Sequence, residues 1–249
     1  MIIKELLTNL YSNNSPYLSC EEKYIDNGYP HTNILTDLLK VLFRNIESTY
    51  IVECGSMLGG SAIKMAETLN NMNKSTEIIC IDPFTGDVNM WDWEKNGGTG
   101  KGGWRFLRLE NGIPTIYKRF LANCKYNGFE EKILPINTTT SVGIKLLQRL
   151  FAQRRITSLP NYIYLDSAHE KDETFFELSL CWNCLTNNSI LFGDDWGWKS
   201  VREDVIKFSN TIIKSSNYQQ LNKIHDLIKG SEIVNTNILL YKGQWVLFK

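Results

Sequence analysis

Acidic side chains follow two short apolar runs in the second half of the chain. Asp166 comes directly after the run 162–165, and Asp194 and Asp195 come after the run 189–192 and one glycine. If these runs are neighbouring strands of a parallel sheet, the three carboxylates meet at the carboxyl ends of the strands. Open α/β folds place their sites at this edge.

Three ionised carboxylates within a few ångströms repel one another strongly unless a positive charge lies between them. A divalent cation is the simplest remedy. Oxygen ligands with positions left for water and substrate suit Mg²⁺, with Mn²⁺ or Ca²⁺ as alternatives, better than zinc. We therefore predict a metal site formed by Asp166, Asp194 and Asp195. The alternative is that Asp194 and Asp195 cap the helix expected over 201–211 and bind no metal.

A glycine-rich turn near residue 55 is the second feature that could carry chemistry. β-Branched and apolar residues at 50–54 are followed by Gly55, Gly59 and Gly60, and then by apolar residues at helical spacing over 62–69. The pattern predicts a strand, a turn and a helix. Glycine lets a ligand approach the main chain, and the helix N-terminus offers N–H groups to an anion. The alternative role of such a turn is to pack the helix on the sheet.

The spacing of these glycines excludes two common nucleotide motifs. It lacks the Gly-x-Gly-x-x-Gly fingerprint of dinucleotide sites, and no Lys-Ser or Lys-Thr follows the last glycine as in a phosphate-binding loop. The turn therefore indicates a nucleoside site of another type.

Asp82 stands at the end of the second expected strand, 77–81, and is followed by Pro83 and Phe84. An acid at this position is placed to accept hydrogen bonds from both ribose hydroxyls of a nucleoside lying across the sheet edge. We therefore predict that Asp82 binds ribose. The alternative is a turn aspartate before proline.

Strands and helices alternate from residue 50 onward, which predicts an α/β fold with a Rossmann-like, doubly wound, mostly parallel sheet and helices on both faces. Two or three strands over 219–224, 238–240 and 244–248 are expected to complete a seven-stranded sheet with an antiparallel C-terminal hairpin. We expect one structural domain overall. Residues 1–48 would form an N-terminal helical cap, and residues 49–249 the nucleoside-binding domain.

An insertion over residues 85–110 interrupts the alternation. It carries Trp91, Trp93 and Trp104 around a glycine-rich run at 96–103. Long loops inside a compact domain are typical of functional lids. We interpret the tryptophans as a flap that covers a bound substrate, with Trp196 as a further substrate contact. The alternative is that the insertion packs on the neighbouring subunit of a homodimer.

The overall composition excludes several classes of partner. Lysine plus arginine equal aspartate plus glutamate at 27 each, so no net charge favours nucleic acid or an anionic membrane. No apolar run reaches membrane-spanning length, and the six cysteines lack the spacing of a disulfide framework. Cys181 and Cys184 are interpreted as small core residues. We expect a soluble, cytoplasmic protein, in the host cytosol if the chain is viral.

Four motifs in this order resemble the class I S-adenosylmethionine (AdoMet) methyltransferases of the cation-dependent O-methyltransferase type. They are Glu-x-Gly-x-x-x-Gly-x-Ser at 53–61, Ile-Asp-Pro-Phe at 81–84, Leu-Asp-Ser-Ala-His at 165–169 and Gly-Asp-Asp-Trp at 193–196. That group includes a catechol type, a type that methylates sugars of macrolide antibiotics, and cephalosporin-hydroxylase-like proteins. The resemblance covers roughly residues 50–209.

The resemblance implies a role for individual residues in cofactor binding. Glu53 and the Gly55 backbone would lie near the methionine moiety, and Ser61 would reach its carboxylate. The other positions that it assigns to the cofactor are Ser56, Gly59 and Ser167, with Thr139 and Thr140 beside the adenine.

The resemblance also implies the chemistry. Asp166, Asp194 and Asp195 match the metal ligands, and His169 stands where the catechol type carries a lysine general base. Histidine suits this role because its unperturbed pKa lies near neutrality. Asp166 is the substitute base if the histidine is misplaced.

The expected reaction is methyl transfer from AdoMet to a hydroxyl of a sugar, glycan or similar polyhydroxyl molecule, with a divalent cation at the site. The tryptophan-bearing insertion favours a sugar over a catechol. Lys171 replaces an aromatic residue common in the sugar-modifying relatives, so the acceptor is less defined than the reaction. The alternatives are a nicotinamide-dependent oxidoreductase on the same scaffold and a non-catalytic AdoMet-binding module of a glycan-building assembly.

Overall fold

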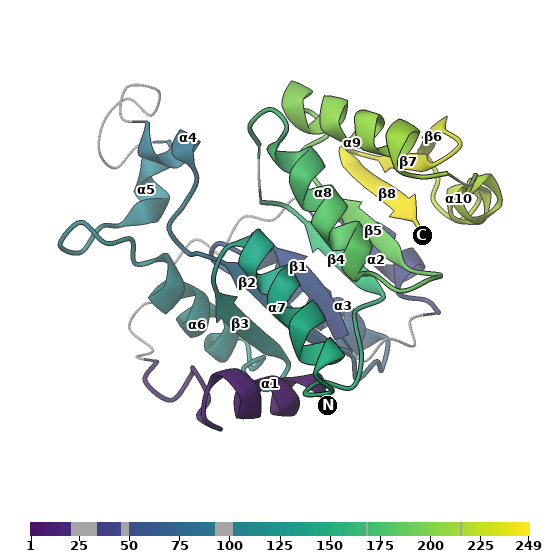
Figure 1. Ribbon diagram of the computed structural model, residues 1–249. Helices are drawn as coiled ribbons and strands as arrows, with labels where there is room; N and C mark the ends of the chain where they lie inside the picture. The colour runs from purple at the N-terminus through teal and green to yellow at the C-terminus, as the bar shows by residue number, and fades with distance from the viewer. Residues whose placement is uncertain (21–33, 46–49, 93–101, 168, 215) are drawn as a thin grey trace.

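The computed structural model describes residues 1–20, 34–45, 50–92, 102–167, 169–214 and 216–249 (Figure 1). Its helices are α1 (Ile2–Leu10), α2 (Thr36–Leu42), α3 (Gly60–Asn71), α4 (Val88–Trp91), α5 (Trp104–Leu107), α6 (Ile116–Tyr126), α7 (Thr140–Ala152), α8 (Glu173–Cys184), α9 (Lys199–Thr211) and α10 (Tyr218–His225). Its strands are β1 (Tyr50–Cys54), β2 (Glu77–Asp82), β3 (Ile133–Asn137), β4 (Tyr162–Leu165), β5 (Ile190–Gly193), β6 (Glu232–Asn235), β7 (Ile238–Tyr241) and β8 (Gln244–Phe248).

The described strands form one sheet in the order β3-β2-β1-β4-β5-β8-β7-β6. The first five are parallel, and β8, β7 and β6 continue the sheet with antiparallel pairs. The strand order reverses between β1 and β4, and such a switch point opens a crevice at the carboxyl ends of the strands. The expected α/β fold with an antiparallel C-terminal hairpin is confirmed.

Among the described residues the sheet has eight strands, so the prediction of seven was wrong. The additional strand is β6, a half-buried edge strand with weak alternation and an irregular register to β7. The strand expected over 219–224 was also wrong, because this segment lies in α10. Leu221, Ile224 and Ile228 pack into one core at helical spacing, which decides for the helix.

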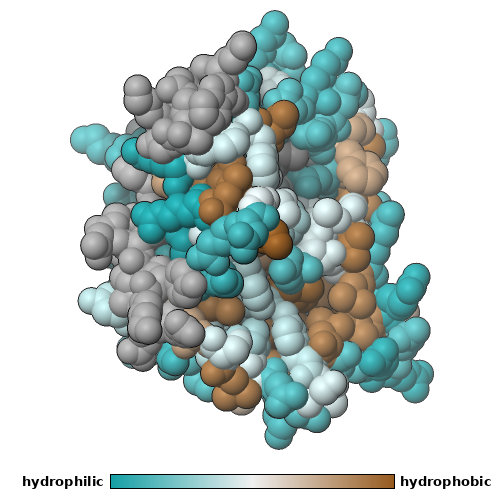
Figure 2. Space-filling view, turned by 90° about the vertical axis from the view of Figure 1, so that its left-hand side faces the viewer, coloured by the Kyte–Doolittle hydropathy of each residue, from teal (hydrophilic) through white to brown (hydrophobic). Residues whose placement is uncertain are grey.

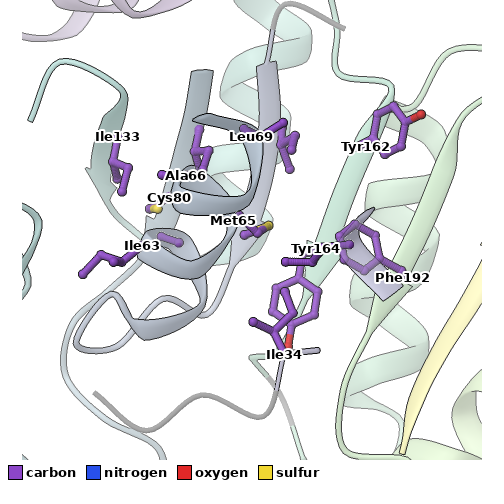
Figure 3. Packing of buried hydrophobic residues seen from close by; sticks show 14 of the residues in the cluster. Ile34, Ile63, Met65, Ala66, Leu69, Cys80, Ile133, Tyr162, Tyr164 and Phe192 are labelled. Carbon is purple, nitrogen blue, oxygen red and sulfur yellow. The ribbon is translucent and has the colours of Figure 1, made fainter. Parts of the chain in front are cut away.

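Alternation along the strands divides the interior into two cores, one on each face of the sheet. On β1, Ile51 belongs to the core under α2, α3, α6 and α10, whereas Tyr50 and Val52 belong to the core under α1, α7, α8 and α9. Figure 3 shows the first core, where Met65 and Ala66 of α3 lie close to strand residues of the sheet. Both faces of the parallel strands are therefore covered, and their carboxyl ends are left as the accessible edge.

Helices α7, α8 and α9 cover the front of the sheet in Figure 1, and α3 lies behind it. α4 and α5 come from the segment 85–110 and lie beyond the end of the sheet, at the upper left of Figure 1. Cys181 and Cys184 are buried on α8 with reduced thiols, as expected of core residues.

Figure 2 views the molecule from the side of α5 and α6. Hydrophilic side chains cover much of this face, and apolar ones gather toward the right-hand edge of the view. Within the part of the chain that the structure describes, no helix combines the length and the apolar character needed to cross a membrane.

Candidate active site

A cavity of about 670 Å³ opens at the carboxyl ends of the parallel strands, where the strand order reverses. Its size falls within the range of small-molecule sites, roughly 300–1,000 Å³. Ten of the residues assigned from the sequence line it: Gly55, Ser56, Ser61, Asp82, Thr139, Thr140, Asp166, Ser167, His169 and Asp195. The residues chosen from the sequence thus lie at the edge of the sheet where the cavity opens, the carboxyl ends of the parallel strands.

The glycine turn brings β1 against the end of β4. Gly55 has φ 84°, and a Cβ atom there would lie 1.9 Å from the carbonyl oxygen of Asp166. Gly59, with φ 88°, is the N-cap of α3, and no side chain caps this helix. Gly60 and Ser61 in the first turn of α3 line the cavity, so the helix N-terminus faces it. This turn can hold an anionic group of a ligand.

Asp82 is a structural centre of the glycine turn. Its Oδ2 accepts hydrogen bonds from the backbone N–H groups of Ser56 at 2.7 Å and Met57 at 2.8 Å, and its Oδ1 accepts one from the N–H of Phe84. Burial raises the pKa of Asp82, and these three hydrogen bonds oppose that rise. A carboxylate has about four acceptor positions, so one remains for a ribose hydroxyl. The observed role of Asp82 is to hold the turn in shape. Its contact with ribose stays a prediction.

Glu53 lies beneath the turn and does not line the cavity. It is fully buried, and its two oxygens accept hydrogen bonds from the Ser61 hydroxyl and, at 3.2 Å, from the Cys80 thiol. Burial raises the pKa of Glu53 to about 7, although hydrogen bonds lower it in part. The hydroxyl of Ser61, which the sequence assigned to the cofactor carboxylate, is thus bonded to Glu53.

A polar wall of the cavity lies between α7 and α8. It is formed by Thr139, Thr140, Ser167 and Glu177. Thr139 is the N-cap of α7, and its side chain accepts a hydrogen bond from Val142 N–H. The Ser167 hydroxyl donates to Glu177 Oε2 at 2.6 Å. The wall lies on the same cavity as the glycine turn, where the resemblance assigned the adenine.

Asp166, His169 and Asp195 form the chemical centre of the cavity. One ligand atom from each lies within 4.8 Å of the other two. Asp166 follows β4, and Asp195 lies two residues after β5, and these strands are hydrogen-bonded neighbours with Leu165 opposite Gly193. The expected meeting of two separate acidic segments at one sheet edge is therefore what the structure shows.

The His169 ring lies between two carboxylates. Its Nε2 is 2.6 Å from Asp195 Oδ2, and its Nδ1 is 3.4 Å from Asp87 Oδ2 without a well-aligned hydrogen bond. Burial alone would lower the pKa of His169, but Asp195, Asp87 and Asp166 raise it to about 10. The ring therefore holds a proton in this arrangement, whereas a general base requires the neutral ring.

Within this group, the ionised form of the Asp166 carboxyl is destabilised by its surroundings. Burial raises its pKa well above the usual value, and the charges of Asp195 and Asp194 raise it further, while His169 opposes the rise. The hydroxyl of Tyr164 lies 3.4 Å from Asp166 Oδ2. Repulsion among the three acids, expected from the sequence, is thus present.

Asp194 takes a different place from its neighbour. It does not belong to the close group of ligand atoms and does not line the cavity, and its backbone carbonyl accepts a hydrogen bond from the Trp245 indole at 2.9 Å. Asp195 has φ 62°, so the chain turns sharply between the two side chains. The sequence predicted Asp166, Asp194 and Asp195 as the metal ligands. The residues whose ligand atoms lie close together are instead Asp166, His169 and Asp195.

The capping alternative for the acidic pair is also not what the structure shows. The N-cap of α9 is Trp198, beyond both aspartates, and no side-chain hydrogen bond caps this helix. The Trp198 ring lies against the His169 ring at a tilt of 36°, with centroids 5.0 Å apart. Trp196, which the sequence assigned to the substrate, instead packs against the core on the side of α7–α9.

The described tryptophans of the insertion pack on each other. Trp91 and Trp104 meet edge to face with centroids 5.9 Å apart, and the Trp91 indole donates to the Thr85 carbonyl at 2.9 Å. Neither ring lines the cavity, and Trp93 lies outside the described residues. The segment contributes Asp87, Met90 and Phe106 to the cavity in their place.

Sequence reasoning missed these residues and the face of α8. Glu173, Phe176 and Glu177 line the cavity from the first turns of α8, at spacings of three and four residues. Asp87 had a usable signal, because it is an acid five residues after Asp82 and caps α4 by accepting from Met90 N–H at 3.0 Å. The α8 residues had none, because only the packing of α8 decides which of its faces meets the cavity.

Residues 52–196 match the model of a family described as methyltransferase domains. The match spans more than half of the chain, so the chain belongs to this family. This confirms the methyltransferase class predicted from the sequence and sets aside the alternative of a nicotinamide-dependent oxidoreductase. Comparison with curated proteins finds no significant match.

Solved structures with similar folds include three methyltransferases. The calicheamicin methyltransferase CalS11 is 17% identical, with 98% of this chain and 90% of that chain covered and a TM-score of 0.49. TomG from Streptomyces achromogenes, an O-methyltransferase of tomaymycin synthesis in complex with SAM, is 14% identical, with coverage of 99% and 96% and a TM-score of 0.45. An O-methyltransferase from Bacillus cereus in complex with SAH is 11% identical, with coverage of 100% and 90% and a TM-score of 0.43. Similarities of this size do not bear on the substrate of this chain.

Proposed function

We propose that the protein is an O-methyltransferase that transfers the methyl group of AdoMet to a hydroxyl of a sugar or similar polyhydroxyl molecule, assisted by a divalent cation. One observation carries the proposal: a single cavity holds both the glycine turn at the N-terminus of α3 and the group of Asp166, His169 and Asp195. The first is suited to a nucleoside with an anionic end, and the second to activation of a hydroxyl.

The residues present fit a divalent cation. Two carboxylates and an imidazole offer ligand atoms within 4.8 Å, the carboxyl of Asp166 is destabilised by like charge, and His169 Nδ1 is buried without a hydrogen-bond partner. Asp166 and Asp195 would hold the cation, which would supply a lowered pKa for the acceptor hydroxyl. The nearby imidazole makes Mn²⁺ a better candidate than an all-oxygen set would.

The chain's own residues position the reaction. The glycine turn and α3 hold the cofactor in place, and Asp82 keeps that turn in shape through its three backbone hydrogen bonds. A cation held by Asp166 and Asp195 would offset the negative charges that keep His169 protonated, and the neutral ring, with Asp87 beside its Nδ1, would then take up the hydroxyl proton. Because methyl transfer needs oxygen, methyl carbon and sulfur in line, most of the acceleration comes from this positioning.

A direct test incubates the protein with labelled AdoMet and a panel of sugars and catechols, with and without EDTA. Transfer that EDTA abolishes and Mn²⁺ or Mg²⁺ restores is the expected result. Transfer that persists with EDTA removes the metal from the proposal. Binding of S-adenosylhomocysteine without transfer to any hydroxyl favours the alternative of a non-catalytic module.

The two adjacent aspartates allow a matched test of the metal site. Asp195→Asn is expected to weaken Mn²⁺ binding by about tenfold or more, because it removes a ligand from the group, whereas Asp194→Asn retains binding within about threefold. Isothermal titration with Mn²⁺ measures both. Equal losses in the two variants contradict the set of ligands drawn from the geometry.

A further inference from the structure

The cavity is strongly acidic although the chain as a whole is neutral. Its lining carries six carboxyl side chains, and none of the described lining residues is lysine or arginine. The six are Asp82, Asp87, Asp166, Glu173, Glu177 and Asp195. Since the chain has 27 acidic and 27 basic residues, this excess is local to the cavity.

Five of the six carboxylates have roles at the cofactor or the chemical centre. Asp82 is used by the glycine turn, and Asp166 and Asp195 belong to the group around His169. Asp87 lies beside the His169 ring, and Glu177 accepts the hydrogen bond from Ser167 in the polar wall. Glu173 extends the negative charge along α8 toward the part of the cavity that the insertion forms.

An exposed aromatic ring stands among these charges. Phe176 lines the cavity with 52% of its surface exposed, between Glu173 and Glu177 on the same face of α8. The α8 dipole accounts for an acid such as Glu173 in its first turn. It does not account for a large aromatic side chain kept in water beside that acid. A ring face next to carboxylates is the arrangement that attracts an organic cation.

The opposite wall agrees with this arrangement. Met90 and Phe106 provide apolar surface there, and Asp87 lies beside them. Arg105 stacks on the Phe106 ring, 4.7 Å from its centroid, but is not among the residues that line the cavity.

We infer that the hydroxyl acceptor of this enzyme carries an ammonium group, as an amino sugar or a hydroxylated amine does, and carries no phosphate or carboxylate. The inference rests on the proposed function and names its substrate class. The ammonium group lies against Glu173 and the Phe176 ring, and the hydroxyl lies at Asp166 and His169.

The charges also define what the cavity rejects. A phosphate or carboxylate on the acceptor places like charge beside several carboxylates in a partly enclosed space, which is unfavourable. Nucleotide-linked sugars, sugar phosphates and coenzyme A thioesters are therefore excluded as acceptors. A neutral sugar is tolerated but lacks the attraction.

The test compares ligands of one shape and three charges on two scaffolds. The sugar set is glucosamine, glucose and glucuronate, and the phenol set is tyramine, tyrosol and 4-hydroxyphenylacetate. S-adenosylhomocysteine is first titrated into the protein by calorimetry, and the six probes are then titrated into the loaded protein by ligand-observed NMR near neutral pH. If S-adenosylhomocysteine does not bind, the proposed function itself fails. If it binds, the probes judge the inference alone.

The cationic member of each set is expected to bind about fivefold more tightly than the neutral member, with the anionic member weakest, and added salt is expected to reduce the difference. Glu173→Gln is expected to weaken the cationic probes about threefold and to leave the neutral probes and S-adenosylhomocysteine unchanged. Glu203→Gln is the control, because it removes one exposed carboxylate on α9 with the same change of net charge.

Three results overturn the inference: an anionic probe that binds as well as its cationic partner, the failure of both cationic probes to bind, or equal effects of Glu173→Gln and Glu203→Gln.

Discussion

The proposed function gives the cavity a cofactor end and an acceptor end, and these are held in place by different means. At the cofactor end, the turn after β1 is fixed by the backbone of β4, by the Asp82 carboxylate and by buried Glu53. At the acceptor end, the lining comes from the short helices α4 and α5 and from the partly exposed face of α8. Under the proposed function, the donor of the methyl group would meet a surface fixed by buried contacts, whereas the acceptor would meet side chains that can change at little cost to the fold.

The largest difference in the free energy of unfolding between the two ends is expected when a glycine at each end is replaced by alanine. Gly55→Ala would place Cβ 1.9 Å from the carbonyl oxygen of Asp166, and backbone atoms cannot move aside easily. We expect a loss of about 4 kcal/mol or more in the free energy of unfolding, or no folded protein. Urea denaturation measures it.

Gly112→Ala is the matched control in the loop after α5. Gly112 has φ 80°, close to that of Gly55, but a Cβ atom added there would meet no heavy atom within 4 Å beyond its chain neighbours. We expect a loss of about 1–2 kcal/mol, the cost of the left-handed backbone alone. Equal losses at Gly55 and Gly112 would show that close packing at the cofactor end contributes nothing.

A pH-dependent effect is expected for Glu53. Its pKa is about 7 in the folded protein, above the value of an exposed glutamate, so the folded state keeps a proton that the unfolded state releases. Stability is therefore full below about pH 4.5 and falls as the pH rises toward 7, by about 3 kcal/mol in total. Glu53→Gln removes this fall. The measurement is the difference in unfolding free energy between the wild type and the variant from pH 5 to pH 8, and a constant difference contradicts the prediction.

A smaller effect is expected for Asp82. Asp82→Asn keeps the shape but weakens the three hydrogen bonds from backbone N–H groups, which should cost about 2 kcal/mol and lower the affinity for S-adenosylhomocysteine. Glu110→Gln is the counterpart near the insertion, where an exposed ion pair to Lys118 is worth about 0.5 kcal/mol. Thermal denaturation and calorimetry compare the two variants. A loss of affinity for S-adenosylhomocysteine in both variants would contradict the expected difference between the two ends.

The smallest effect on stability is expected at the acceptor end. Phe106→Ala should cost about 1 kcal/mol, because the ring is only partly buried, and should leave the affinity for S-adenosylhomocysteine within about twofold. The same variant should weaken probes that enter the acceptor end. Phe151→Ala on α7 removes an exposed ring outside the cavity and serves as the control. Loss of cofactor affinity in Phe106→Ala would mean that the two ends are coupled.

The sequence was most informative where local pattern and chemistry coincide. The turn at Gly55 and the acid at Asp166 were placed correctly, because glycine after a strand and an acid at a strand end have meaning within a few residues of chain. The prediction that the tryptophans of the insertion face the substrate was not met by Trp91 and Trp104, because the type of a side chain does not show which way it points. Trp91 and Trp104 pack on each other, and Met90 and Phe106 face the cavity.

The sequence by itself determined the α/β class, the parallel sheet and the edge at which the site lies, because hydrophobic periodicity and strand-end residues are local properties. Only the tertiary structure decided that Asp195 rather than Asp194 joins Asp166 in the close group of ligand atoms, that His169 lies between Asp195 and Asp87, and that one face of α8 lines the cavity. These outcomes depend on a reversal of the chain at Asp195 and on the packing of segments far apart in sequence, which no local pattern encodes.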